Sequence, residues 1–247
     1  PHTARPLAKL IEARRALGER PLTFAVVFSY SMHNYMLRYW MAEAGIDPDR
    51  DVRLVVAPPS RMNEKLRSGE IDGFCVGAPW NALAVSESTG EIIIYAADFW
   101  KVGPDKVFGV TAAWAQERPQ AVTAVVRALL KAAAWCDEPQ NRPALAKLLA
   151  RPDYVDAPEA VIAESLLGSP AYAADKSGSD SLDYLIYHRY AANFPWRSHA
   201  LWFLTQMRRW GQIGPEVDMR LAAETVYRPD LFRVAAAQLR QSSPLVD

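Results

Sequence analysis

Short apolar runs alternate with helix-like segments between residues 22 and 112, and this alternation restricts the fold more than any other feature of the sequence. Residues 22–28 read LTFAVVF, a run of β-branched and aromatic residues that predicts a buried strand ending in a turn. Similar runs predict further strands at residues 52–57, 74–76, 92–95 and 107–111. Strands that alternate with helices predict an α/β fold in which helices cover both faces of a parallel sheet.

Helix signals lie between these runs. Ser31 is predicted to cap a helix whose apolar residues recur at helical spacing until Gly45. The next helix is predicted to open at Pro59 and to end at Gly69, and Pro79 begins another. A parallel sheet of this kind binds ligands beyond the carboxyl ends of its strands. Candidate site residues are therefore expected in the loops that follow the predicted strands.

Three positions, His33, Gly77 and Lys106, each lie at a junction between an apolar run and a turn or helix start. We predict that they form one anion pocket. Lys106 supplies a compact positive charge, and His33 supplies a ring donor close to the first turn of its helix. Gly77 has no side chain, so its own N–H can approach a ligand closely.

Each of these residues also has a structural interpretation. A histidine near a helix start often caps it, a glycine after a strand often forms a turn, and Lys106 stands beside Asp105 as a solvated charge would. Trp80 is a further candidate, as the floor of the pocket, although aromatic residues at helix starts more often pack into a core.

After Ala113 the sequence predicts helices, the longest at residues 119–135, with shorter ones at 144–149, 158–167, 198–210 and 229–239. Tyr184, Tyr187 and Tyr190 recur at a spacing of three and would share one face if their segment were helical. We divide the chain into a leading helix at residues 1–21, an α/β lobe with the anion site at 22–112, and a helical part of another lobe at 113–247.

Charge and cysteine content exclude several classes of partner. The chain has 28 basic and 28 acidic residues, so no overall charge favours nucleic acid or an anionic membrane. Cys75 and Cys136 are far apart, which indicates neither a zinc site nor a disulfide framework. No apolar run is long enough to span a membrane, and the first residues show no signal peptide and no initial Met. We expect no cofactor, no metal and no membrane insertion.

An ordered series of motifs carries a family resemblance: HNYMLRYWMAEAGIDPDRDVRLVVAPP, MNEKLRSGEIDGFCVGAPWN, PDKVFGVTAAW and FPWRSHALWFLTQMRRWGQI. This series, which extends over nearly the whole chain, resembles the nitrate- and bicarbonate-binding proteins of ABC importers and the related cytoplasmic nitrate sensors. The resemblance implies a periplasmic-binding-protein-like fold of type II, with two α/β lobes joined by crossover strands and an anion held in the cleft.

The resemblance also implies which residues bind. The nitrate binders have a His, a Gly and a Lys at the positions of His33, Gly77 and Lys106, whereas the bicarbonate binders lack the His and Lys pairing and recruit a metal through an acidic residue. This chain therefore resembles the nitrate branch. The family has a further part of the first lobe before the position of Pro1, with additional ligands, so the pocket is expected to be incomplete without that part.

Two binding functions follow from the resemblance. A periplasmic solute-binding protein would deliver nitrate or nitrite to an ABC permease. A cytoplasmic sensor would instead control an antitermination regulator, and Ala78 favours this alternative because the importers commonly have Glu there. An enzyme is the remaining class: Cys75 with His33, or Glu70 with Asp72, could act as a reactive pair. We interpret Cys75 as a core residue because it lies in the apolar run GFCVG, and the two acidic residues as turn residues because they stand beside a glycine at a strand start. No phosphate loop, GxSxG or HExxH motif is present.

Overall fold

The computed structural model of the chain describes residues 3–168 and 184–246. The chain forms two compact units, and each unit combines two separate stretches of sequence. Unit 1 consists of Pro1–Gly103 and Pro143–Leu185, and unit 2 consists of Pro104–Arg142 and Ile186–Asp247. The candidate residues His33, Gly77 and Trp80 belong to unit 1, and Lys106 belongs to unit 2.

The sheet of unit 1 is parallel, as the sequence predicts. Its strands in the described part of the chain are β1 (Thr23–Val26), β2 (Arg53–Val56) and β3 (Gly73–Cys75), in the order β2-β1-β3. Val26 is paired with Val56 on one side and with Cys75 on the other. Since β1 and β3 are parallel neighbours that end in register, the loops that follow them leave the same edge of the sheet.

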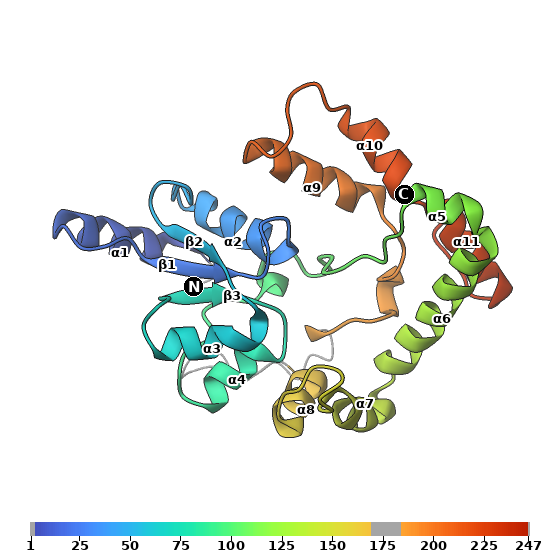
Figure 1. Cartoon of the computed structure of the whole chain (residues 1–247), viewed down its shortest axis with the longest axis horizontal. Coiled ribbons are helices and arrows are strands. Elements are labelled where there is room, and N and C mark those ends of the chain that lie inside the picture. Colours follow the sequence, from blue (N-terminus) through green and yellow to red (C-terminus); the bar gives the residue numbers. More distant parts are fainter. Residues whose placement is uncertain (1–2, 169–183, 247) are drawn as a thin grey trace. The chain divides into compact units, whose positions relative to one another are not determined.

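Helices cover both faces of this sheet (Figure 1). On one face, Val26 packs in a cluster with residues of α1 (Arg5–Ala16) and α2 (Met32–Glu43), among them Ile11 and Met41. On the other face, Ala25 packs with Met62 of α3 (Pro59–Arg67). Successive side chains of β1 thus pack into apolar clusters on opposite faces of the sheet. A strand that is buried on both faces has no side toward solvent, which explains why the sequence of β1 is almost continuously apolar.

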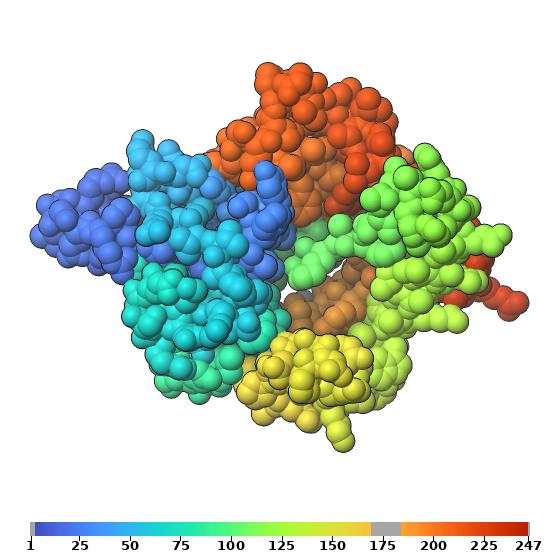
Figure 2. All heavy atoms as spheres, in the orientation of Figure 1, coloured from blue at the N-terminus to red at the C-terminus, as the bar shows by residue number. Residues whose placement is uncertain are grey.

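The described part of unit 1 also contains α4 (Trp80–Ser86), the 3-10 turn η1 (Ala96–Asp98), α7 (Arg142–Leu149) and α8 (Glu159–Leu167). Arg142, the first residue of α7, belongs to unit 2. Helix α4 packs against α3 and α8, and Figure 2 shows the atoms of α3 and α4 side by side on the near face of unit 1. These neighbours fix the helix that follows the loop containing Gly77.

In the residues that the structure describes, unit 2 is helical and has no strand. Its helices are α5 (Ala112–Glu117), α6 (Pro119–Asp137), α9 (Arg197–Arg209), α10 (Met219–Val226) and α11 (Pro229–Gln238), with short 3-10 turns η2 (Pro139–Asn141) and η4 (Arg189–Ala191). Helix α6 packs against α11 through Leu130, Ala235 and Ala236, and α9 packs against α10 (Figure 1). None of the described helices has both the length and the apolar character that crossing a membrane requires.

Two strand predictions are wrong. Residues 92–95 and 107–111 form no strand, because no other strand among the described residues pairs with them. Ile92 and Tyr95 are buried without belonging to a sheet, while Val107 is 67% exposed. A β-branched run indicates a preference for extended backbone, but a strand also needs a neighbour to accept its hydrogen bonds.

The condition for a shared tyrosine face, a helical segment, is not met. Residues 184–196 contain no α-helix, and Tyr190 has a φ of 58°. Tyr184 and Tyr187 therefore do not share a helical face, and each makes contacts of its own in a different unit.

Candidate anion site

The loop between β1 and α2 places His33 at the second position of α2. Ser31 caps this helix as predicted, since its Oγ accepts a hydrogen bond of 3.2 Å from the amide of Asn34. Asn34 is buried, and its Nδ2 donates to the carbonyl of Ser29 at 2.7 Å. Asn34 thus fixes the loop that carries His33, a role that sequence reasoning missed.

Gly77 lies against the ring of His33. A Cβ added at Gly77 would lie 3.4 Å from Nε2 and 3.8 Å from Cε1 of His33. The two residues come from loops that follow β1 and β3, and the neighbouring position of these strands explains the approach. The structure therefore brings together two of the candidate ligands. The imidazole nitrogen Nε2 of His33 lies close to the backbone of Gly77, which has no side chain.

Trp80 follows Gly77 closely, as the first residue of α4, after a cis peptide bond between Ala78 and Pro79. Its side chain is half-buried. The next residue, Asn81, donates a hydrogen bond of 2.9 Å from Nδ2 to the hydroxyl of Tyr184. Sequence reasoning missed this contact, because the two residues are 103 positions apart.

Lys106 lies in unit 2, in the extended stretch before α5. Its Nζ is 2.7 Å from Oδ2 of Asp105, and its side chain is 76% exposed. An exposed ion pair contributes little to stability, so the ammonium group can exchange Asp105 for another anion at low cost. The convergence of Lys106 with His33 and Gly77 stays a prediction.

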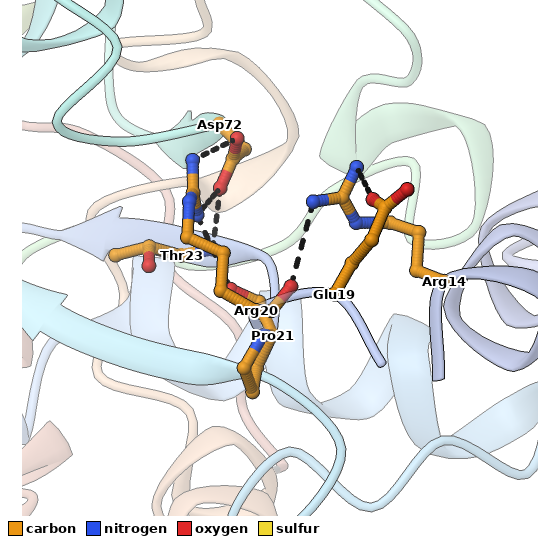
Figure 3. A network of polar contacts seen from close by, with 6 residues as sticks. All are labelled: Arg14, Glu19, Arg20, Pro21, Thr23 and Asp72. Atoms are coloured by element: carbon orange, nitrogen blue, oxygen red, sulfur yellow. Dashed lines mark hydrogen bonds and ion pairs between the residues drawn. The ribbon is translucent and has the colours of Figure 1, made fainter. Parts of the chain in front are cut away.

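The acidic residues of the enzyme alternative are bound to other groups in unit 1. Asp72 accepts from Nη1 and Nη2 of Arg20 at 2.7 and 2.9 Å and from the amide of Thr23 at 2.8 Å (Figure 3). Burial alone raises the pKa of Asp72, but the donors from Arg20 and Thr23 outweigh it and hold this pKa below its usual value. Glu70 pairs with Lys65. Asp72 therefore stays ionised and joins β1 to the start of β3.

Cys75, the other reactive candidate, lies on β3 and packs against the apolar cluster that contains Val26 and Met41. A cysteine in such a position serves as a small apolar side chain. No group of three or more His, Cys, Asp or Glu residues able to hold a metal occurs among residues 3–168 and 184–246.

The close approach of Gly77 to His33 gives a test. We expect Gly77→Ala to weaken nitrate binding about threefold to tenfold, because the new methyl group contacts the imidazole and obstructs access to the amide. Gly109→Ala is the matched control, since a Cβ added there meets no atom within 4 Å. Calorimetric titration of both variants measures the difference, and equal affinities would remove Gly77 from the site.

A protein-family model described as the NMT1-like family matches residues 2–150. The nitrate import ATP-binding protein NrtC of Synechocystis is 38% identical over 233 residues, 93% of this chain and 35% of NrtC. The nitrate/nitrite binding protein NrtA of Synechococcus elongatus is 36% identical over 231 residues, 94% of this chain and 52% of NrtA. The bicarbonate transport ATP-binding protein CmpC of the same species is 37% identical over 228 residues, 91% of this chain and 33% of CmpC.

The comparison with solved structures gives a close match. The periplasmic nitrate-binding protein NrtA from Synechocystis superposes with a TM-score of 0.90 at 28% identity, over 96% of this chain and 61% of that protein. The match confirms the predicted periplasmic-binding-protein-like fold. The chain spans about half or less of the length of these curated relatives.

Proposed function

The chain belongs to the NMT1-like family, and on that premise we propose that it captures nitrate or nitrite for an ABC uptake system. Two kinds of observation support the proposal. Relatives named as nitrate-binding proteins match more than nine-tenths of the chain. Within unit 1, His33 and Gly77 lie against each other where the loops after β1 and β3 meet, and this contact is the observation that carries the proposal.

The proposed chemistry follows from the anion. Nitrate is planar and its oxygens are weak acceptors, so a site must supply a positive charge and several donors to replace water. We propose that Lys106 provides the charge, His33 a ring N–H and Gly77 a backbone N–H, with Trp80 beside them. A charge-assisted hydrogen bond of the Lys106 kind contributes about 1.5–3 kcal/mol.

A solute-binding role fits these residues better than catalysis does. Asp72 and Glu70 are held in ion pairs, Cys75 packs in the core of unit 1, and the similar proteins are named for binding and import. The proposed partner is an ABC permease, and the proposed location is the periplasm.

The alternative function is a cytoplasmic nitrate sensor that controls an antitermination regulator. Ala78, between Gly77 and Pro79, is the residue that favours it, because the importers that the sequence resembles commonly have Glu there. Fractionation of the cells that make this protein separates the two functions. Recovery in the periplasm supports the importer, and recovery in the cytoplasm together with bound regulator supports the sensor.

Calorimetric titration tests the binding function directly. We expect the 247-residue chain to bind nitrate or nitrite, more weakly than it would with the family's additional ligands, to bind bicarbonate more weakly still whether or not calcium is added, and to return nitrate unchanged. At a nitrate concentration about a hundred times the Kd, the free energy of unfolding should rise by about 2.7 kcal/mol. Calcium-dependent bicarbonate binding without nitrate binding would contradict the proposed substrate, and consumption of nitrate would contradict a binding role.

A further inference from the structure

The chain passes from unit 1 to unit 2 between Leu185 and Ile186. We name residues 184–189 the crossing segment. Before this point, contacts of the segment bind it to unit 1, and after this point, contacts of the segment bind it to unit 2.

In unit 1 the crossing segment is held through Tyr184. Its hydroxyl accepts a hydrogen bond of 2.9 Å from Nδ2 of Asn81, and its ring meets the ring of Tyr95 edge-on with centroids 5.0 Å apart. Tyr95 is itself fixed, since it is 7% exposed and its amide donates to Asp98 at 2.8 Å. Burial raises the pKa of Tyr184 to about 12, so the hydroxyl keeps its proton at neutral pH.

Asn81 depends on this hydroxyl. Its Oδ1 is buried and has no hydrogen-bond partner among the residues that the structure describes, so the contact with Tyr184 is what orients the amide group. Asn81 is the second residue of α4, next to Trp80 and a short loop away from Gly77. The side chain that holds Tyr184 therefore belongs to the stretch that carries two of the proposed ligands.

In unit 2 the crossing segment is held by Asp137, the last residue of α6. Its carboxylate accepts from the amides of Tyr187, His188 and Arg189 at 3.2, 3.0 and 2.7 Å, and from Nε of Arg189 at 3.1 Å. Only Leu185 and Ile186 lie between this anchor and Tyr184. The segment is therefore anchored on both sides of the crossing, within a few residues.

We propose that Tyr184 is a positioning residue for the anion site: through Asn81 it sets the start of α4 and the approach of Gly77 to His33. The inference rests on the proposed function, because it assigns Tyr184 a role in binding the same anion. It also implies that the positions of the proposed ligands in unit 1 depend on how firmly Tyr184 anchors the chain before it leaves that unit.

A double-mutant cycle tests this role. Tyr184→Phe keeps the ring and removes the hydroxyl, and Asn81→Ala removes the amide. We expect each variant to weaken nitrate binding about threefold to tenfold. The double variant should bind no more weakly than either single variant, because both substitutions remove the same contact. Tyr190→Phe is the control, since Tyr190 is 61% exposed. Calorimetry gives the affinities, and thermal unfolding without nitrate gives the stability of each variant.

Hydrogen exchange at residues 77–83, measured without nitrate, supplies a reading that does not depend on the ligand. We expect faster exchange there in Tyr184→Phe than in the unmodified chain or Tyr190→Phe. A lower melting temperature with unchanged affinity and exchange would show a merely structural tyrosine and overturn the proposal, as would additive losses in the double variant. If the unmodified chain binds no nitrate, the proposed function fails. The exchange comparison still decides whether Tyr184 positions α4, and unchanged exchange in Tyr184→Phe would overturn that role.

Discussion

Lys106→Glu is expected to abolish nitrate binding, with a loss of affinity greater than about a hundredfold. Lys106 is the proposed source of positive charge, and its ammonium group already lies beside the carboxylate of Asp105. The substitution removes an attraction and places a second carboxylate at the same point. Both changes disfavour an anion, and they add because the ligand carries a full negative charge.

Lys131→Glu provides the matched control for charge. Lys131 is exposed on α6 in the same unit, so the change in net charge is identical while the position differs. Lys106→Gln separates the two effects, because it removes the cation without adding an anion, and we expect it to bind with intermediate affinity. Calorimetric titration should show a normal isotherm for Lys131→Glu and no heat for Lys106→Glu. Equal affinities of these two variants would exclude Lys106 from the site.

Asp137→Ala is expected to lower the free energy of unfolding by about 3–5 kcal/mol, the cost of removing one partner of a buried ion pair. The Asp137 side chain is 5% exposed, and the guanidinium of Arg142, which lies 3.5 Å away, is in a side chain that is 1% exposed. Without the carboxylate, the buried guanidinium of Arg142 loses this counter-charge and the amides of Tyr187, His188 and Arg189 lose this acceptor.

Urea denaturation measures this loss, with Glu117→Ala as the control, since Glu117 pairs with Arg118 while 66% exposed. If Asp137→Ala does not accumulate as folded protein, Asp137→Asn, which keeps the size of the side chain, gives the reading. A change smaller than about 0.5 kcal/mol in Asp137→Asn, the range of ordinary surface substitutions, would contradict the role of Asp137.

The pKa of Asp137 predicts how this stability depends on pH. Burial alone raises this pKa, but the amides of Arg189, Tyr187 and His188 outweigh burial and hold it below its ordinary value. Because the pKa is lower in the folded state, the stabilisation is complete above the unfolded-state pKa of about 3.9. It is lost as the pH falls through the folded-state pKa, so the difference between the unmodified chain and Asp137→Ala should shrink in strong acid.

The sequence predicted the parts of the fold that depend on local signals. Ser31 could be recognised as the cap of α2 because a serine before an apolar helical pattern is a typical N-cap. The first three strands could be recognised because their apolar runs are short and bounded by turn residues. Residues 92–95 and 107–111 have the same local signal and form no strand. The difference lies in whether a neighbouring strand is available, and a run of side chains does not encode that.

The candidate site divides in the same way. That His33 and Gly77 follow strands could be read from the sequence, and neighbouring parallel strands bring such loops to one edge. Asn34, Asn81 and Asp137 could not be identified, because their roles come from contacts with the backbone or with residues far away in the chain. A polar side chain that binds its own loop resembles an ordinary surface residue until the loop is folded.

Because each unit consists of two stretches of chain that alternate along the sequence, no single cut in the backbone separates one unit from the other. During synthesis, α4 must wait for α8 and Tyr184 to leave the ribosome, and by then the first stretch of unit 2 has already emerged. A fragment that ends at residue 103 would lack the second stretch of unit 1, and a fragment that begins at residue 104 would carry that stretch without the rest of unit 1. Genetic dissection of this protein into halves is therefore a poor strategy, and single substitutions are the better tool.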